Sequence, residues 1–298
     1  MKNTPRLLTL LLALALVPLY SQETADSLSL WMVETTDGNE FTGNILFEDS
    51  TGIILNTSIY GELLIPASHI KKREEIRSDL LVDGEYWFGN PHATRYFFGP
   101  TVHGLQKGEG YYQNTWILLN QVNYGISNYL SLGGGVMPLF LFAGAPTPVW
   151  ITPKLSVPVA SDKVHLGADM LFAHILGDGS SFGIAYGAST FGNRENNMTL
   201  GAGWGFSGYD SNWDWSDRVT LMLSGMTRVG RKTYLLTENY YLSLGEGESF
   251  GIIMLGGRSV QKRLAVDYGL VLPVGTDLGE FIAIPWLSIT LPFGNIQQ

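Results

Sequence analysis

The chain has 298 residues, a formal net charge of −9 and no cysteine, and only 15% of its residues are charged. The lack of cysteine excludes disulfides, thiol catalysis and cysteine-bound zinc, and the negative charge argues against a nucleic-acid partner. Soluble domains usually contain about 25% charged residues. The low content found here, together with 36 glycines, is therefore unusual for a soluble domain.

Residues 1–21 predict a secretory signal peptide. Lys2 and Arg6 form a basic start, residues 7–17 form an apolar core, and polar sequence begins at Gln22. A bilayer-spanning helix needs about 20 apolar residues, so this core is too short to cross a membrane. Cleavage near Gln22 is favoured over an uncleaved anchor, and we expect an exported protein.

Residues 28–76 predict a small β-module with five strands, at 28–35, 40–49, 53–57, 62–66 and 70–76. Asp37-Gly38 is a strong hairpin turn between the first two strands. Residues 35–76, TTDGNEFTGNILFEDSTGIILNTSIYGELLIPASHIKKREEI, resemble the small Sm-like or SH3-like barrels. The resemblance lies in a strand, an Asp-Gly turn, a glycine-containing strand, an Ile-Pro strand and a short basic strand. It implies a fold, and it carries no catalytic residues.

The one basic run of this module is Lys71-Lys72-Arg73, which Glu74 and Glu75 follow directly. Members of the Sm family often bind RNA, but acidic neighbours favour a solvated edge strand here. We therefore expect the module to stabilise the rest of the protein or to contact another periplasmic protein. Residues 77–92 predict a linker.

Residues 93–298 predict an antiparallel transmembrane β-barrel of about 12 strands, which makes the whole chain all-β. Apolar residues alternate with small or polar ones at the period of a strand, as Met198, Leu200 and Trp204 do with Thr199. The apolar set would face lipid. The expected strands are 93–102, 111–124, 128–140, 148–158, 163–174, 181–192, 196–207, 218–229, 232–244, 249–259, 263–273 and 281–293.

Two features qualify this pattern. Glu238 interrupts the apolar set Tyr234, Leu236, Tyr240 and Leu242, which a β-bulge or an interface position would explain. Aromatic residues near strand ends or on lipid faces predict an interfacial girdle. These are Trp116, Tyr124, Trp150, Trp204, Tyr240, Tyr241, Trp286 and Phe293.

Connection lengths predict which end of the barrel faces the periplasm. With an even strand count and a periplasmic N-terminus, every second connection is periplasmic, and these are the short ones, such as 193–195 and 230–231. The longer connections, such as 208–217 and 274–280, would face outward, as is usual for outer-membrane barrels. The outward connections are rich in acidic residues. These residues would either bind cations near lipopolysaccharide or keep the surface soluble, and we favour the second interpretation.

The chain resembles the uncharacterised outer-membrane β-barrel proteins of Gram-negative envelopes, some of which carry a small β-module before the barrel. The resemblance implies outer-membrane lipid and lipopolysaccharide as surroundings, and insertion by the outer-membrane insertion machinery. Leu287, Ile289, Leu291 and Phe293 share one face of the last expected strand. That pattern is similar to the C-terminal signal of such proteins, although five residues follow Phe293.

A barrel of 12 strands is wider than a packed eight-stranded barrel and narrower than a porin, so we expect a plugged or narrow lumen. Ionisable residues that would line it are Lys154, His165, Asp169, Arg228, Arg263 and Asp267. They would form an internal salt-bridge network or a polar permeation path. The sequence predicts no cofactor, and no His, Asp or Glu cluster has metal-ligand spacing. Gly133-Gly134-Gly135 opens no helix, so it predicts no nucleotide site.

A structural or passive-transport role is therefore the function we expect, with no enzymatic activity. Two alternatives remain. A soluble secreted all-β binding protein would pack its apolar faces against one another. An outer-membrane hydrolase would resemble a twelve-stranded phospholipase family with a Ser-His-Asn site, and His174 with Ser180 or Ser181 is the nearest match. No motif supplies a third orienting residue, and residues 177–181 predict a loop.

Overall fold

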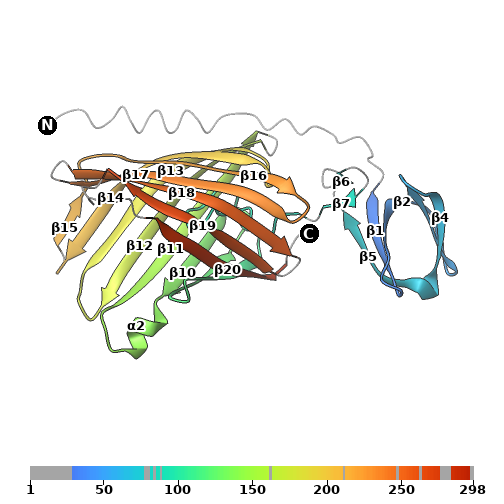
Figure 1. The fold of residues 1–298 in the computed structure, drawn as a ribbon, viewed down its shortest axis with the longest axis horizontal. Helices are drawn as coiled ribbons and strands as arrows, with labels where there is room; N and C mark the ends of the chain where they lie inside the picture. The colour runs from blue at the N-terminus through green and yellow to red at the C-terminus, as the bar shows by residue number, and fades with distance from the viewer. Residues whose placement is uncertain are drawn as a thin grey trace. The chain divides into compact units, whose positions relative to one another are not determined.

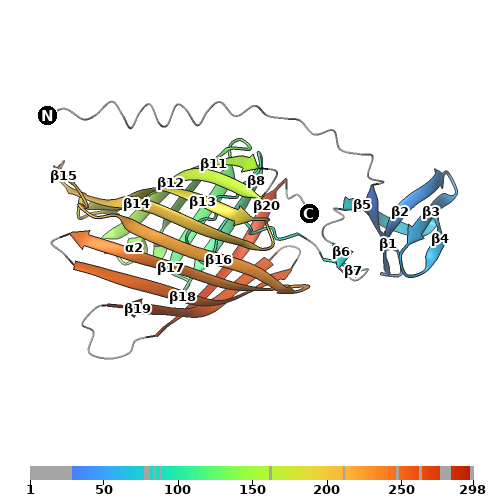
Figure 2. The ribbon, with the colours of Figure 1, turned by 90° about the horizontal axis from the view of Figure 1, so that it is seen from above.

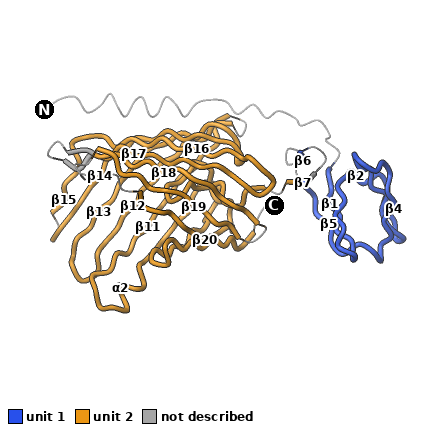
Figure 3. Tube along the Cα trace, viewed as in Figure 1, with its two compact units in different colours: residues 1–86 blue, residues 87–298 orange. Residues whose placement is uncertain are grey.

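The computed structural model describes residues 29–76, 81–82, 85–87, 89–160, 163–210, 212–245, 248–261, 264–275 and 283–295. The chain divides between Tyr86 and Trp87 into two compact units (Figure 3). Each unit is described by itself below. The predicted signal peptide lies outside the described residues. Among the described residues, no helix is both long and apolar enough to cross a membrane.

The first unit contains a five-stranded antiparallel sheet in the order β4-β3-β2-β1-β5 (Figures 1 and 2). Its elements match the sequence prediction to within two residues, and a 3₁₀ turn, η1, joins the last two strands. The elements are β1 (Leu30–Thr35), β2 (Glu40–Asp49), β3 (Gly52–Thr57), β4 (Gly61–Pro66), η1 (Ala67–His69) and β5 (Ile70–Ile76). A short separate pair follows, β6 (Leu81–Val82) and β7 (Glu85–Tyr86).

The module has its own apolar core, built from inward-facing side chains of β1, β3 and β4. Val33, Ile53, Leu55 and Ile65 are almost fully buried and pack together. β2 bends at a register shift between residues 45 and 47. A five-stranded module in this part of the chain is thus confirmed.

The basic run on β5 is neutralised by glutamates of the same module. Lys71 Nζ lies 2.6 Å from Glu34 Oε1, and Arg73 Nη1 lies 2.6 Å from Glu48 Oε1. Lys72 pairs with Glu74. These exposed pairs contribute little stability, but they match the prediction of a solvated strand.

The second unit is a closed antiparallel β-barrel of 12 strands, as predicted (Figures 1 and 2). Each strand pairs with the next, and the last strand pairs with the first to close the barrel. The strands are β8 (Glu109–Thr115), β9 (Leu119–Gly125), β10 (Leu130–Val136), β11 (Thr147–Ala160), β12 (Val164–Leu176), β13 (Ser181–Gly192), β14 (Asn197–Tyr209), β16 (Thr220–Gly230), β17 (Thr233–Gly245), β18 (Glu248–Gln261), β19 (Leu264–Val274) and β20 (Ile284–Gly294).

Two connections of the barrel carry structure of their own. A short helix, α2 (Pro138–Phe142), lies between β10 and β11, and a short strand, β15 (Asn212–Trp215), folds back on β14. Trp213 and Trp215 of β15 pack against Phe206 on the outer face of β14, with ring centroids 6.1 and 5.0 Å apart. Both features belong to the set of longer connections.

The predicted strand count is right, but two of the predicted strands are wrong. Residues 93–102 form no strand of the barrel, and only an isolated bridge joins Arg95 to Pro100. Residues 111–124 are two strands, β8 and β9, joined by a tight turn at Trp116-Ile117, so they are not one long strand. The two errors cancel in the count. The later connections keep their predicted ends, but the first does not: residues 103–108 precede β8, and the first connection between barrel strands is the turn at residues 116–118.

The inward and outward faces alternate along every strand, although the apolar set does not always face out. On β14, Met198, Leu200 and Trp204 are exposed on the outer face, whereas Thr199 is fully buried. On β17 the apolar set faces inward instead of outward, because Tyr234 and Leu236 are buried in the barrel.

The predicted aromatic girdle is wrong at several positions for the same reason. Trp150 and Trp286 are buried on the inner face, and Tyr240 lines the interior. Trp204 and Tyr241 are exposed, as the prediction required. The interior is therefore more aromatic than alternation alone suggests.

Candidate functional site in the barrel interior

The barrel interior is partly filled by the chain itself. Residues 89–108, here called the inner segment, precede β8 and lie within the barrel unit. His92, Tyr96 and Phe97 have no solvent exposure, and Lys107 is the one exposed residue of the inner segment. An irregular segment can be buried this deeply only if its backbone polar groups find partners. The barrel wall supplies them.

Arg95 of the inner segment joins a buried ionic cluster with Arg258 on β18 and Asp267 on β19. Asp267 Oδ2 lies 2.5 Å from Arg95 Nη1, and Asp267 Oδ1 lies 2.5 Å from Arg258 Nε. All three side chains are at most 1% exposed. One carboxylate thus neutralises two guanidinium groups in part, and backbone carbonyls complete their hydrogen bonds.

Those carbonyls belong to the inner segment. Arg258 donates to the carbonyl oxygens of His92 and Tyr96, at 2.7 and 2.5 Å. Arg95 donates to the carbonyl oxygens of Tyr96 and Phe97, at 2.7 and 3.1 Å. The ionic cluster therefore fixes the path of the backbone as well as neutralising charge, because each bond demands one position of the carbonyl.

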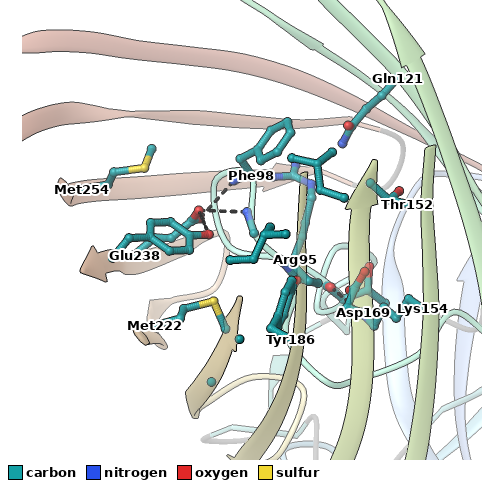
Figure 4. Close-up of a pocket in the computed structure, with 18 of the residues that line it drawn as sticks. Arg95, Phe98, Gln121, Thr152, Lys154, Asp169, Tyr186, Met222, Glu238 and Met254 are labelled. Carbon is teal, nitrogen blue, oxygen red and sulfur yellow. Dashed lines mark hydrogen bonds between the residues drawn. The ribbon is translucent and has the colours of Figure 1, made fainter. Parts of the chain in front are cut away.

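Glu238 on β17 binds the tip of the inner segment, which is formed by residues 97–100. Its carboxylate accepts three hydrogen bonds, from the backbone N–H groups of Phe97, Phe98 and Gly99, at 2.7, 3.0 and 2.8 Å (Figure 4). The hydroxyl of Tyr240 donates a fourth, at 2.7 Å. Successive backbone N–H groups that converge on one carboxylate form an anion-binding nest. This arrangement explains why an acid interrupts the apolar set on β17.

Residues on both sides of this tip are hydrogen-bonded to the opposite wall, which β11 and β13 form. Lys154 on β11 donates to the carbonyl oxygens of Thr94 and His103, at 3.1 and 2.7 Å. The Val102 N–H donates to Thr190 Oγ1 on β13 at 2.7 Å, and Ser156 Oγ donates to the Val102 carbonyl. Contacts to strands around most of the circumference make the inner segment a part of the fold rather than a loose tail.

The structure places the predicted lumen-lining residues in different surroundings. Lys154 and Asp169 are cross-strand partners on β11 and β12, and the Asp169 carboxylate is hydrogen-bonded to Tyr186 on β13 (Figure 4). His165 is buried beside His103, with ring centroids 4.4 Å apart. Asp267 is the centre of the ionic cluster described above.

Arg228 lies at the end of the barrel that carries the short connections. Its Nη1 is 2.9 Å from Glu195 Oε2, and its guanidinium lies over the rings of Trp87 and Tyr234. Arg263 lies outside the described residues. The described members of the predicted set therefore do not form one network. They have four different surroundings: Lys154 with Asp169, His165 beside His103, Asp267 in the ionic cluster, and Arg228 with Glu195.

Sequence reasoning missed the residues that carry the interior structure, namely Arg95, Arg258 and Glu238. Two of them left a signal. Glu238 was an acid among apolar neighbours, and Arg258 lies nine residues from Asp267 in the facing strand. Arg95 gave none, because its segment was predicted to be a strand.

A cavity of about 510 Å³ remains in the half of the barrel that carries the longer connections. The tip of the inner segment closes one side of it, with Phe98, Gly99 and Pro100 in its wall. Most of the remaining wall is apolar, as Leu171, Ile184 and Met254 illustrate (Figure 4 labels Met254). A cavity of this size falls within the range of small-molecule sites.

The suggested hydrolase pair is present as a contact, on the outer face of the barrel. His174 Nδ1 and Ser181 Oγ are 2.9 Å apart across β12 and β13. In the part of the chain that the structure describes, no carboxylate or amide side chain is hydrogen-bonded to His174. A nucleophile and a base without an orienting group form an incomplete hydrolase site.

Among the described ranges, no three His, Asp or Glu side chains are placed to hold a metal ion. No protein-family model matches the chain, and no curated protein is significantly similar to it in sequence. Function has therefore to be inferred from the geometry of the barrel and its interior.

Proposed function

We propose that this protein is an outer-membrane β-barrel protein of a Gram-negative envelope, with a structural or passive-transport role. The barrel would span the bilayer and the N-terminal module would lie in the periplasm. One observation carries the proposal: large apolar side chains are exposed around the outside of a closed barrel, on strand after strand.

The exposed apolar belt is continuous around the barrel. Its members include Leu132, Leu155, Leu166, Leu200, Leu223, Leu255, Leu270 and Leu287, each between 40% and 53% exposed. Soluble monomers rarely expose contiguous apolar patches of more than a few hundred Å², because each Å² of apolar surface left in water costs about 25 cal/mol. A hydrocarbon surrounding removes that cost. A closed barrel also leaves no backbone group unpaired at its edges.

The barrel ends favour the same surroundings. The helix α2 exposes Leu139, Leu141 and Phe142, and β15 exposes Trp213 and Trp215. Tryptophan and other amphipathic rings favour the membrane–water interface, where lipopolysaccharide would be the outer-leaflet lipid. On β20, Leu287 and Phe293 are both exposed on the outer face, which suits a signal read by the insertion machinery.

The closed interior limits the kind of transport that we propose. The inner segment fills the end of the barrel with the short connections, so passage of a solute requires that the inner segment move. We therefore propose a barrel that is structural in its resting state. It would pass solutes slowly when the tip of the inner segment is released from Glu238, which fits both the cavity and the hydrogen bonds around Glu238.

For the module we propose an Sm-like or SH3-like fold and a periplasmic protein as partner. The strand order and the bend in β2 support the fold. Leu46, Phe47, Leu64 and Tyr60 are all close to half exposed or more, which supports a protein contact. The pairing of the basic run with glutamates speaks against nucleic acid.

Fractionation of cells that produce the full chain tests the membrane assignment. We expect the protein in the outer-membrane fraction, soluble only with detergent, and with a gel mobility that changes on boiling. Recovery of a monodisperse protein from the aqueous fraction would contradict it and would favour the soluble secreted binding protein instead.

A second function, hydrolysis of lipid esters at the outer face, has one observation in its favour, the contact between His174 and Ser181. We propose that the pair is structural and that the protein is not an enzyme, because the described residues supply no orienting group. Activity measurements on the two alanine variants decide between these readings.

A further inference from the structure

The interior cavity is divided by chemistry into an apolar wall and a polar wall. Consecutive strands from β16 to β19 contribute five apolar side chains, Met222, Leu242, Ile252, Met254 and Val271, beside three polar ones, Thr220, Glu238 and Tyr240. The opposite wall, formed by β9 to β11, contributes Gln121, Asn123, Ser131 and Thr152. A ligand that satisfies both walls must be amphipathic.

The charged groups in the wall are already neutralised by their neighbours. Glu238 is saturated by three backbone N–H groups and Tyr240. Lys154 faces Asp169 across the strand pair and donates to two carbonyl oxygens of the inner segment. Arg95 shares Asp267 with Arg258, so this cluster keeps one surplus positive charge, which the negative charge of Glu238 balances in the sum over the interior. A ligand with a net charge would therefore enter without a counter-charge, which is costly in a buried site.

Three nitrogen donors in the cavity wall have no partner within the described chain: Arg95 Nε, Trp286 Nε1 and Asn123 Nδ2, all buried atoms; Thr94 Oγ1 is a further buried polar atom of this kind. Arg95 belongs to the ionic cluster, so Trp286 and Asn123 are the two uncharged nitrogen donors. Trp286 is 7% exposed and lies between Phe97 of the inner segment and Trp116 of the β8–β9 turn, with ring centroids 5.9 and 4.9 Å away. A buried donor without an acceptor is unfavourable, so these groups call for an acceptor oxygen.

We propose that this cavity binds a single-chain lipid with an uncharged, oxygen-bearing head group. The chain lies along the apolar wall from β16 to β19, and the head accepts hydrogen bonds from Trp286 and Asn123. The inference deepens the proposed function and rests on it in one respect, because the bilayer is the source of such a ligand.

Native mass spectrometry of the full chain tests the proposal, with 1-monolauroylglycerol as the probe and release from a polyoxyethylene detergent. We expect one saturable adduct on the wild type. Val271→Trp fills the cavity from its apolar wall and should remove the adduct. Leu270→Trp, the next residue on the outer face, should leave it unchanged. A wild type without an adduct, or equal binding by both variants, would overturn the proposal.

Head-group specificity is measured with the laurate anion and dodecane as further probes. We expect laurate to bind at least tenfold more weakly than the glycerol ester. Equal or tighter binding of laurate would overturn the assignment of an uncharged head.

Trp286→Phe keeps the ring and removes one donor. It should lower the affinity for the glycerol ester roughly fivefold, the effect of one hydrogen bond, and leave the affinity for dodecane unchanged. This comparison holds even if Val271→Trp fails to fold, and an unchanged ester affinity would count against the proposed donor.

Failure of the proposed membrane function can be distinguished from failure of lipid binding. A protein that is soluble without detergent would end the membrane assignment, and the same titration on that soluble protein would still decide whether the cavity binds the ester.

Discussion

Arg95 and Asp267 are 172 residues apart in the sequence and 2.5 Å apart in the barrel interior. The contact joins an irregular segment to a barrel strand through two fully buried charges. A buried ion pair is weak evidence of stabilisation in itself, because desolvation offsets the attraction. Its consequence is specificity: the inner segment has one place where its guanidinium group is neutralised.

Replacing Asp267 by Asn should strongly destabilise the barrel. Both Arg95 and Arg258 would lose their counter-charge in a buried site, and breaking a buried pair costs about 3–5 kcal/mol. Unfolding in guanidinium, followed by tryptophan fluorescence, measures the change. Asp214→Asn on the exposed strand β15 is the matched control, expected within about 0.5 kcal/mol of the wild type. A similar small change in both variants would refute the role of the cluster.

Replacing Glu238 by Ala should release the tip of the inner segment. Three backbone N–H groups would lose their acceptor, at about 1–3 kcal/mol for the unsatisfied groups together with lost packing. We expect faster amide exchange at Phe97, Phe98 and Gly99, and more frequent openings in a single-channel recording. Asn239→Ala, the next residue and on the outer face, should change neither. Closed behaviour in both variants would argue against gating by the inner segment.

The sequence predicted the strands where alternation and turn chemistry agreed, and failed where they did not. The turn between β8 and β9 places Trp116 and Ile117 at φ of 52° and 67°, values that normally select Gly, Asn or Asp. A bulky pair gave no turn signal, so two strands were read as one. Residues 93–102 contain three consecutive aromatic residues, Tyr96, Phe97 and Phe98, among small and polar ones, and such a composition also suits a segment enclosed by a barrel.

The candidate site was harder to predict than the fold, because its contacts are long-range. Lys154 and Asp267 were identified as interior residues from strand parity alone. Asp169, the cross-strand partner of Lys154, belonged to the same predicted set. Arg95 did not, since pairing it with Asp267 requires knowing that the inner segment turns back into the barrel. The cavity likewise depends on where the inner segment stops, at the nest that surrounds Glu238.

The purified protein should not hydrolyse lipid or p-nitrophenyl esters above a detergent blank. Ser181→Ala and His174→Ala should be equally inactive, because the described residues give His174 no orienting partner. Each variant loses one hydrogen bond, at about 1 kcal/mol, and should keep its heat-modifiable mobility. Activity in the parent that both variants lose, with the fold retained, would establish the hydrolase instead.

The Asp37 turn should make the module less stable in acid. The hydrogen bond from the Thr35 hydroxyl lowers the pKa of Asp37 below its ordinary value of 3.8. A carboxyl whose pKa is lower in the folded than in the unfolded state stabilises at higher pH, and this contribution is lost as the pH falls through the folded value.

Calorimetry of the full chain checks this expectation with Asp37→Asn, which keeps a residue that suits the turn. The wild-type module should melt above the variant at about pH 6, and the difference should shrink towards pH 3 or below, under the ordinary range of Asp. A difference that does not change with pH would show that the ionised carboxylate contributes nothing.

Spin-label accessibility along β16, in reconstituted bilayers, tests most directly whether the outer face meets hydrocarbon. The chain has no cysteine, so single cysteines from Leu221 to Met226 can be labelled without background. We predict a period of two: labels at Leu221 and Leu223 accessible to oxygen and shielded from an aqueous nickel reagent, and labels at Met222 and Ser224 shielded from oxygen. Labels at Leu221 and Leu223 that the nickel reagent reaches freely would contradict a membrane-spanning barrel.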